Sequence, residues 1–320
     1  MPVLEVKNLK TYYYTLRGVV KAVDDVSFTL EEGEVLGIAG ESGCGKSTLA
    51  WALMGLVPSP GKIAGGTINL DGIEITKLSE DELRKKVRWK KISMIFQGAM
   101  NALNPVYSIE NQLTEPLMIH AGLTKNEARE QVAKLLEAVG LDATIMRRYP
   151  HELSGGQKQR VVIAMALLLN PKLVIADEPT TALDVIVQAQ IMNLFKQIKE
   201  KYKVAMIFIT HDLSLIAEIA DKVAIMYAGK IVEIGTSEQI FLNPQHPYTQ
   251  GLLKSIPRIR SKEKISWIPG VPPDLVRPPP GCRFYPRCPY AMDKCRKIEP
   301  TLIEVEPQHF VACHLMGEKK

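Results

Sequence analysis

The residues best suited to chemistry form a glycine-rich segment that reads Gly40-Glu41-Ser42-Gly43-Cys44-Gly45-Lys46-Ser47. This segment matches the pattern G-x-x-x-x-G-K-[ST]. It follows an apolar run typical of a buried strand, Val35–Ala39, and it precedes a segment with helical spacing. Backbone N–H groups of such a loop surround phosphate oxygens, and the positive end of the following helix attracts them further. The segment therefore predicts a site for the phosphates of a nucleotide.

The side chains of this loop have separate expected roles. Lys46 is expected to reach the β- and γ-phosphates of ATP, and the Ser47 hydroxyl is expected to bind Mg²⁺. Thr48 can place a second hydroxyl near the phosphates. Cys44 is interpreted as a small filler in preference to a redox thiol. The other predicted ATP contacts in the loop are Gly40, Ser42, Gly43 and Gly45.

Two consecutive carboxylates follow a second apolar run, Leu173–Ala176, which predicts another buried strand. Asp177 can hold the Mg²⁺ shell, and Glu178 can orient, or accept a proton from, the water that attacks the γ-phosphate. Carboxylates at a strand end are usually only solvated. Together with a phosphate loop, however, they predict hydrolysis of ATP.

A third motif begins a helical stretch and reads Leu153-Ser154-Gly155-Gly156-Gln157. Ser154 is a good N-cap, and the glycines after it expose N–H groups that can bind an anion. Read together with the phosphate loop, this string resembles the signature motif of the ABC ATPase family. The resemblance implies that Ser154, Gly155, Gly156 and Gln157 contact the γ-phosphate held by an opposite subunit. It also implies a head-to-tail dimer that encloses two ATP molecules.

Further short motifs of the family occur in the expected order. Gln97 follows the strand-like Ile92–Phe96, Asp184 ends the string Ala182-Leu183-Asp184, and His211 follows the strand-like Ala205–Thr210. The resemblance implies that Gln97 senses the γ-phosphate and Mg²⁺ and relays movement to a membrane partner. It implies that His211 contacts the γ-phosphate as the transition state develops, and it adds Asp184 to the nucleotide site.

An aromatic ring near the N-terminus is expected to stack on the adenine base. The run Tyr12-Tyr13-Tyr14 offers three candidates, and spacing from Asn8 within the family's first strand favours Tyr13. Because the register of adjacent tyrosines is uncertain from sequence, simple packing of Tyr13 on the sheet remains an alternative.

The order of elements predicts an α/β fold with a parallel-sheet core, and the resemblance implies that this core is a P-loop ABC ATPase domain. Early strand-like runs, Leu4–Leu9 and Val23–Leu30, predict an antiparallel β subdomain, and helical spacing predicts a helical insert at about 98–153. The expected ATPase domain covers residues 1–242. A proline-rich connecting segment, 243–281, and a cysteine-rich C-terminal lobe, 282–320, complete the predicted organisation.

The cysteines are concentrated in that last segment, at Cys282, Cys288, Cys295 and Cys313. Four thiolates can hold a tetrahedral Zn²⁺ ion or a [4Fe–4S] cluster. The resemblance to peptide-importer ATPases points to the iron–sulfur cluster, with zinc and a metal-free lobe as alternatives. We expect a metal there to act as a structural staple, because the lobe has few apolar residues, in preference to a redox sensor.

Composition restricts the partners. The 40 basic residues are offset by 35 acidic ones without a long basic block, which argues against nucleic acid. The longest apolar run, Val161–Leu169, is too short to cross a bilayer. The start of the chain lacks the features of a secretory signal. We therefore expect a cytosolic chain, and the resemblance implies that it is a peripheral protein at the cytoplasmic face of the cell membrane.

Two further strings, residues 98–106 after Gln97 and Asn243-Pro244-Gln245-His246-Pro247-Tyr248-Thr249, look like the dipeptide/oligopeptide importer branch. This resemblance implies two transmembrane permease subunits, an extracytoplasmic substrate-binding protein and a second, related ATPase subunit. The same scaffold serves uptake of di- or oligopeptides, oligosaccharides or nickel, so the substrate stays open. A soluble ABC ATPase acting on DNA or ribosomes and an exporter are the rival classes.

Overall fold

The computed structural model describes residues 2–98, 102–255 and 267–318. The chain divides into two compact units, each assembled from separate stretches. The first unit contains Met1–Leu4, Leu30–Glu34 and Asn69–Phe208, and the second contains Glu5–Thr29, Val35–Ile68 and Ile209–Lys320. Fully buried apolar side chains occur in both, for example Leu117 in the first unit and Ile225 in the second.

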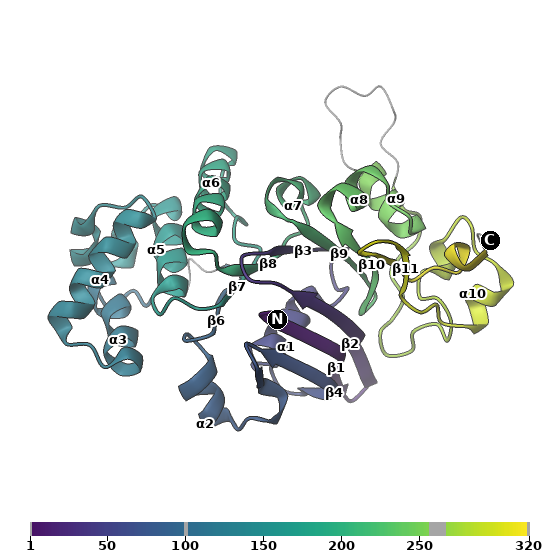
Figure 1. The fold of residues 1–320 in the computed structure, drawn as a ribbon, viewed down its shortest axis with the longest axis horizontal. Helices are drawn as coiled ribbons and strands as arrows, with labels where there is room; N and C mark the ends of the chain where they lie inside the picture. The colour runs from purple at the N-terminus through teal and green to yellow at the C-terminus, as the bar shows by residue number, and fades with distance from the viewer. Residues whose placement is uncertain (1, 99–101, 256–266, 319–320) are drawn as a thin grey trace. The chain divides into compact units, whose positions relative to one another are not determined.

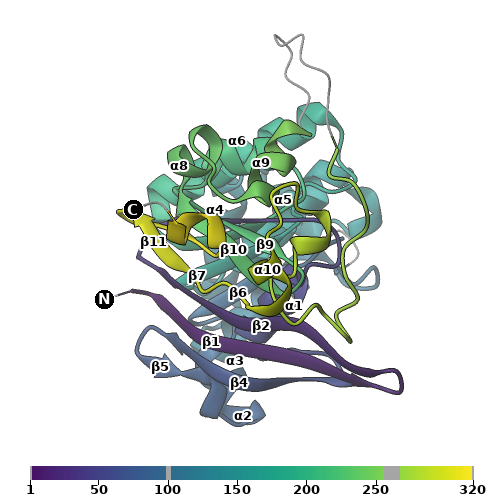
Figure 2. The ribbon, with the colours of Figure 1, turned by 90° about the vertical axis from the view of Figure 1, so that its right-hand side faces the viewer.

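In the second unit, long strands form the predicted antiparallel β layer. β1 (Leu4–Thr15) lies between β2 (Gly18–Leu30) and β4 (Gly61–Leu70), as Figure 2 shows. Apolar residues along β1 alternate with exposed or half-buried ones, and Leu4 and Val6 are buried. Because only two residues join β1 to β2, these neighbours run antiparallel. The last two residues of β4, Asn69 and Leu70, belong to the first unit, where they pair antiparallel with the short β5 (Ile73–Glu74).

The same unit contains a second set of strands, in the order β11-β12-β10-β9-β3. β3 (Val35–Ala39) is buried throughout, as predicted, and runs parallel to β9 (Lys222–Tyr227). β9 turns back into the antiparallel β10 (Lys230–Thr236). The two turn residues, Ala228 and Gly229, both have positive φ, at 47° and 85°. Such a turn matches the right-handed twist of the strands that it joins.

The helices of this unit are α1 (Lys46–Leu53), α7 (Leu213–Ile219), α8 (Ser237–Leu242), α9 (Pro247–Lys254) and α10 (Asp293–Lys297). α1 starts directly after the phosphate loop, as the sequence predicts. α7 packs closely on β3, because a Cβ on Gly37 would lie 2.3 Å from Cγ2 of Ile216. The loop and its helix are therefore placed by a buried strand.

The C-terminal lobe is more regular than the sequence predicts. β12 (His309–Val311) pairs antiparallel with β10, where Val311 stands opposite Glu233. β11 (Ile303–Glu306) adds the next strand. Neither strand is predicted from the sequence, because strands this short show almost no periodicity. Residues 267–280 contain no helix or strand, as their prolines predict.

The first unit contains a buried layer of three strands in the order β8-β7-β6. β6 (Ile92–Ile95), β7 (Leu173–Asp177) and β8 (Ala205–Ile209) are buried at every residue, as expected for strands covered on both faces. β6 and β7 run parallel, with Met94 opposite Ile175. The sequence prediction of these strands is confirmed.

The helices of the first unit are α2 (Glu80–Glu82), α3 (Ile109–Ala121), α4 (Lys125–Ala138), α5 (Gly155–Leu167) and α6 (Val185–Tyr202). In Figure 1, α3 and α4 lie side by side in the predicted helical region. α4 starts at a capping box in which Thr124 and Glu127 bond each other's backbone N–H. Among the described residues, we found no helix that is both long and apolar enough to cross a membrane.

Candidate nucleotide site

The phosphate loop lies in the second unit and depends on glycine at two points. Gly40 and Gly45 have φ values of 151° and 106°. A Cβ on Gly40 would lie 2.1 Å from the carbonyl oxygen of Met226, and one on Gly45 would lie 2.1 Å from that of Ala22. Only glycine fits these positions. The loop is thereby pressed against β9 on one side and β2 on the other.

Lys46 is buried, and its ammonium group lies within the loop. Its Nζ donates to the carbonyl oxygens of Gly40 at 2.7 Å and of Glu41 at 3.1 Å. The Cys44 sulfur is 3.7 Å from the same Nζ, and burial raises the pKa of the Cys44 thiol. A protonated, buried thiol agrees with the interpretation of Cys44 as a filler. The loop therefore offers a positive charge where phosphate oxygens are expected.

The start of α1 adds N–H groups to this charge. Gly45 is the N-cap residue, and no acidic residue occupies the first turn. Ser47 is half-buried, and Thr48 is buried with its hydroxyl oxygen 3.3 Å from that of Tyr13. The structure thus brings Tyr13 beside the first turn of α1, although its role on adenine stays a prediction. Ser42 and Gly43 are exposed.

The carboxylates of the first unit stand at the end of β7. Asp177 is buried, and Glu178 has a φ of 49°. Gln97 Nε2 and the Thr181 hydroxyl each donate to Glu178 Oε2 at 2.9 Å. The structure therefore brings together Gln97 and Glu178, which are far apart in sequence, and it holds the carboxylate in one orientation. Ala99, Met100 and Asn101, in the string after Gln97, lie outside the described residues.

The predicted signature begins α5 in the same unit. Ser154 Oγ accepts from the Gln157 N–H at 3.3 Å, and Gln157 Oε1 accepts from the Ser154 N–H at 3.0 Å. Gly155 and Gly156 form the first turn of the helix. This capping box fixes the start of the helix and directs N–H groups outward.

The start of α6 lies against this motif. A Cβ on Gly156 would lie 2.8 Å from Cγ1 of Val187, whose N–H donates to Asp184 Oδ1 at 2.9 Å. Asp184 is thus the N-cap of α6. Its contact with nucleotide, like those of Ser154, Gly155, Gly156 and Gln157, stays a prediction.

His211 is exposed and belongs to the second unit, with the phosphate loop. Gln97, Asp177 and Glu178 belong to the first unit. Each half of the predicted site is therefore formed within its own unit. The joining of the two halves around one ATP molecule stays a prediction.

The four cysteines of the lobe, Cys282, Cys288, Cys295 and Cys313, line one small cavity. Burial, reinforced by the neighbouring thiols, raises the pKa of Cys282 to about 12 and that of Cys313 to about 11. Among the described residues, however, no three His, Cys, Asp or Glu side chains are placed to hold a metal ion. The structure therefore does not support the predicted metal-binding lobe, either as a [4Fe–4S] cluster or as zinc. Spacing brings the cysteines to one cavity without giving them ligand geometry.

Sequence reasoning missed a group of residues from the C-terminal part of the chain that contact the phosphate loop at Glu41. The Glu41 N–H donates to the Tyr248 hydroxyl at 2.9 Å, and Arg287 donates to both carboxylate oxygens of Glu41 at 2.6 and 2.9 Å. Glu41 occupies a position that the loop pattern leaves open, so the pattern gave no sign of this role. Tyr248 belongs to a string that was recognised only by its resemblance.

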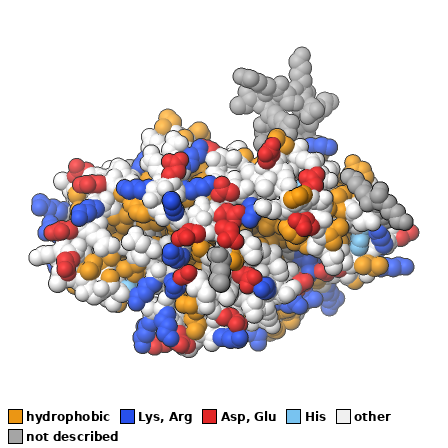
Figure 3. Space-filling view, in the orientation of Figure 1, with side chains coloured by type: hydrophobic (Ala, Val, Ile, Leu, Met, Phe, Trp, Pro, Cys, Tyr) orange, Lys and Arg blue, Asp and Glu red, His pale blue; other side chains and the backbone are white. Residues whose placement is uncertain are grey.

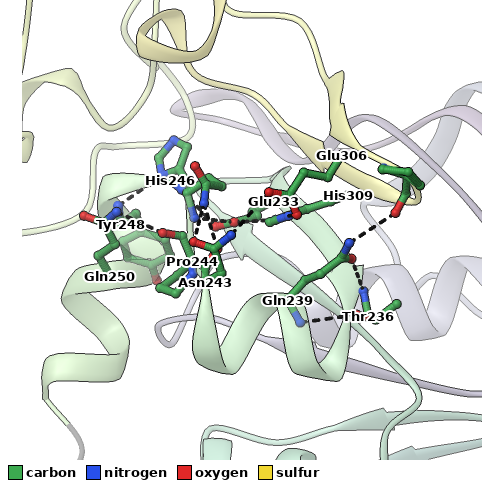
Figure 4. Close-up of polar contacts among 12 residues, drawn as sticks. Glu233, Thr236, Gln239, Asn243, Pro244, His246, Tyr248, Gln250, Glu306 and His309 are labelled. Carbon is green, nitrogen blue, oxygen red and sulfur yellow. Dashed lines mark hydrogen bonds and ion pairs between the residues drawn. The ribbon is translucent and has the colours of Figure 1, made fainter. Parts of the chain in front are cut away.

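A buried network explains that string (Figure 4). Glu233 accepts from the N–H groups of Gln245 at 2.7 Å and His246 at 3.0 Å, and it lies 2.8 Å from His309 Nε2. His246 Nδ1 in turn accepts from the Tyr248 N–H at 3.0 Å and caps α9. Burial lowers the pKa of His246 to about 3, so this ring is neutral. The network fixes the helix that carries Tyr248 to the loop.

Basic and acidic side chains are interspersed on the face that Figure 3 shows. That the protein does not bind nucleic acid, as expected from composition, stays a prediction.

Comparisons with known families match both parts of the chain. Residues 23–181 match the model of the ABC transporter family, and residues 232–295 match the model of the oligopeptide/dipeptide transporter C-terminal region. The second match includes Glu233, Gln245, His246 and Tyr248 of the buried network, but not His309, and three of the four lobe cysteines. The parts of the chain that hold the phosphate loop therefore belong to a recognised segment.

Solved structures of known cassettes share the fold. A dimeric structure of MJ0796, a bacterial ABC transporter cassette, matches with a TM-score of 0.65 and 30% identity, covering 73% of this chain and 98% of that chain. A dimer of MJ0796 in a post-hydrolysis state, bound to ADP and Pi, matches with a TM-score of 0.64 and 29% identity, covering 73% and 98%.

Curated relatives match over nearly the whole length. The oligopeptide transport ATP-binding protein AppD of Bacillus subtilis is 48% identical over 320 residues, which cover 99% of this chain and 97% of that protein. OppD of Escherichia coli, an oligopeptide transport ATP-binding protein, is 50% identical over 313 residues, which cover 97% and 92%. The chain therefore belongs to the ABC transporter family, among its oligopeptide and dipeptide transport ATP-binding proteins.

Proposed function

We propose that this chain binds Mg·ATP at the loop Gly40–Thr48, hydrolyses it as one half of a dimer, and thereby energises the uptake of di- or oligopeptides. The contact between Gln97 and Glu178 carries the proposal of hydrolysis, because it holds a carboxylate at the end of a buried strand in a defined orientation. A chain that only bound nucleotide would not need this arrangement.

The chemistry follows from charge and position. The Lys46 ammonium and the N–H groups at the start of α1 stabilise the negative charge of the phosphates. Glu178, held by Gln97 and Thr181, orients the attacking water in line with the γ-phosphate and accepts its proton as the bond to the leaving oxygen breaks. His211 stabilises the charge on the γ-phosphate in the transition state, and Tyr13 stacks on the adenine.

Ser47, Gln97 and Asp177 would hold Mg²⁺. A hydroxyl at a helix start, a carboxamide and a buried carboxylate provide the oxygen ligands that this ion prefers, so the residues fit it. When bound, Mg²⁺ neutralises charge on the β- and γ-phosphate oxygens.

The dimer completes each ATP site. We propose that Ser154, Gly155, Gly156 and Gln157 of one subunit, with Asp184 nearby, contact the γ-phosphate held by the other. The exposed N–H groups at the start of α5 support this role, because a helix N-terminus attracts anions. The dimeric MJ0796 structures support the assembly. A second, related ATPase subunit is the proposed partner.

Peptide uptake is favoured over oligosaccharide or nickel uptake. AppD and OppD are named for oligopeptide transport, and the C-terminal family model is named for oligopeptide and dipeptide transporters. The proposed partners are two transmembrane permease subunits and an extracytoplasmic substrate-binding protein. They would place this chain at the cytoplasmic face of the membrane.

The test is Mg²⁺-dependent ATPase activity in membranes that contain the chain with its partner subunits. We expect stimulation by a peptide-loaded binding protein and a loss of about 100-fold or more in Glu178→Gln. Glu200→Gln makes the same chemical change at an exposed position of α6 and serves as the matched control. Activity that survives in Glu178→Gln would contradict the mechanism. Stimulation only by a sugar-loaded or nickel-loaded binding protein would contradict peptide uptake.

A further inference from the structure

The cysteine lobe contacts the phosphate loop directly through Arg287. Both terminal nitrogens of this guanidinium donate to the Glu41 carboxylate, at 2.6 and 2.9 Å. The Arg287 side chain is only 5% exposed, whereas that of Glu41 is 27% exposed. A bidentate pair of this kind fixes orientation as well as distance, and its burial protects it from screening by salt.

Arg287 is itself held in one position. Its Nε donates to the Pro269 carbonyl at 2.9 Å, and one terminal nitrogen also donates to the Ile268 carbonyl at 3.3 Å. Its guanidinium carbon lies 5.8 Å from the centre of the Tyr227 ring, in the range of cation–π contacts. Arg287 therefore transmits the position of the lobe to the loop with little freedom of its own.

Glu41 in turn is linked to the catalytic cation. Its N–H is bound to the Tyr248 hydroxyl, and its carbonyl oxygen accepts from Lys46 Nζ at 3.1 Å. Because Arg287 fixes the side chain of Glu41 and Tyr248 fixes its backbone, the peptide that orients Lys46 is set from the C-terminal part of the chain.

A second contact supports the other end of the loop. Arg283 donates to the Ala228 carbonyl and forms an ion pair with Asp24. Gly229, which follows Ala228 in the chain, donates its N–H to the Cys44 carbonyl at 2.8 Å. Both arginines adjoin cysteines of the lobe in sequence, because Arg283 follows Cys282 and Arg287 precedes Cys288. Each arginine is therefore next in sequence to residues that line the cysteine cavity.

We propose that Arg287 is a positioning residue for nucleotide binding, through which the cysteine lobe controls the affinity of the phosphate loop for Mg·ATP. This inference rests on the proposed function. It gives the lobe a regulatory role, since any change that disturbs packing around the cysteines would displace Arg287, Glu41 and finally Lys46.

The test compares Mg·ATP affinity of the full-length chain by titration calorimetry in wild type, Arg287→Ala, Arg287→Lys and Glu41→Gln. We expect Arg287→Ala to raise Kd about tenfold, since it removes a buried, charged pair of hydrogen bonds. Arg287→Lys should restore only part of the affinity, because an ammonium cannot make the bidentate contact. Arg296→Ala removes the same charge from an exposed position of α10 and should leave Kd unchanged.

A double-mutant cycle separates positioning from general damage to the lobe. The effect of Arg287→Ala on Kd should shrink severalfold in the Glu41→Gln background, because the two residues act as one pair. Cys288→Ala should also raise Kd in wild type, and by less in Arg287→Ala. In the assembled transporter, Arg287→Ala should raise KM for ATP with little change in kcat.

Two failures have different meanings. An Arg287→Ala chain that melts at a lower temperature but keeps the wild-type Kd would overturn the positioning role and leave only a structural one. Additive effects of the Arg287 and Glu41 substitutions would overturn it as well. A wild-type chain that does not bind Mg·ATP would instead contradict the proposed function itself.

Discussion

The sequence predicts a ligand site in both the phosphate loop and the cysteine lobe, yet only the loop has the geometry that its motif predicts. The loop needs positive φ at certain glycines and a helix start behind them, and both requirements are local. The lobe would need side chains from separate turns to converge on one ion, which depends on how the whole lobe packs. The cysteines line one cavity, but the described residues form no metal site. A motif that depends on local backbone conformation can therefore be predicted from sequence more reliably than a set of metal ligands.

The phosphate loop also depends on the cysteine lobe for its position. The lobe contacts the loop through Arg287, and the strand β10 supports it through the network around Glu233. If the loop is locally specified but held from the C-terminal side, damage at either place should affect it.

The largest effect is expected from Glu233→Ala. Glu233 is fully buried and accepts hydrogen bonds from the N–H groups of Gln245 and His246, beside His309. Removing it leaves the buried His246 N–H and the half-buried Gln245 N–H without this acceptor, which should lower the free energy of unfolding by about 3–5 kcal/mol. Urea denaturation measures the loss. Glu238→Ala, at an exposed position of α8, is the control, and an equal loss in both would contradict the importance of the network.

Gly45→Ala attacks the loop directly. The new Cβ would lie 2.1 Å from the Ala22 carbonyl, at a φ of 106°, so the loop must shift. We expect a loss of about 2–4 kcal/mol in the free energy of unfolding and no measurable binding of Mg·ATP.

Gly72→Ala is the matched control for this substitution. It also has a positive φ, at 78°, but a Cβ there meets nothing within 4 Å. Gly72→Ala should lower the free energy of unfolding by about 1 kcal/mol and leave nucleotide binding intact. If both variants bound Mg·ATP equally well, the close approach at Gly45 would have no role in shaping the loop.

Sequence reasoning predicted the elements that are apolar over their whole length and failed for those that are not. β3 was predicted with its observed bounds, and β6, β7 and β8 nearly so, because continuous apolar runs identify buried strands. β11 and β12 were missed, since strands of four and three residues have no readable period.

The same distinction holds for the candidate site. The loop residues, Gln97 and Glu178 were each singled out from short motifs, whereas the hydrogen bond between Gln97 and Glu178 was found only in the structure. Arg287 could not be found, because the residues that it joins are far apart in sequence and its partner occupies a position without a pattern. Ion pairs between residues this far apart in sequence can be identified only from the three-dimensional structure.

A pH effect is expected from His246, and over any single pH unit it is smaller than the losses expected from Glu233→Ala and Gly45→Ala. Burial lowers its pKa to about 3 from the ordinary 6.5, so between these values the unfolded chain binds the proton and the folded chain does not. The free energy of unfolding should therefore decrease as pH falls from about 6.5 toward 3, by up to about 1.4 kcal/mol per pH unit from this group. Urea denaturation at several pH values measures the slope.

His246→Asn should flatten that slope, because asparagine can still cap α9 but does not titrate in this range. His151→Asn, at an exposed position of the other unit, controls for the loss of one histidine. A slope that His246→Asn leaves unchanged would show that other groups cause the acid sensitivity.

The smallest effect is expected from Thr236→Ala, which removes a helix cap beside the network. Thr236 and Gln239 form the capping box of α8, and Gln239 Nε2 also donates to the Pro307 carbonyl, between β11 and β12, at 3.1 Å. Loss of the cap should cost about 1 kcal/mol in urea denaturation. Thr124→Ala breaks an equivalent box at α4 that has no such second contact in the described structure, so it should cost less by a few tenths of a kcal/mol. Equal losses would mean that the contact between α8 and Pro307 adds nothing to the stability of this region. The C-terminal part of the chain would then support the phosphate loop through Glu233 and Arg287 alone.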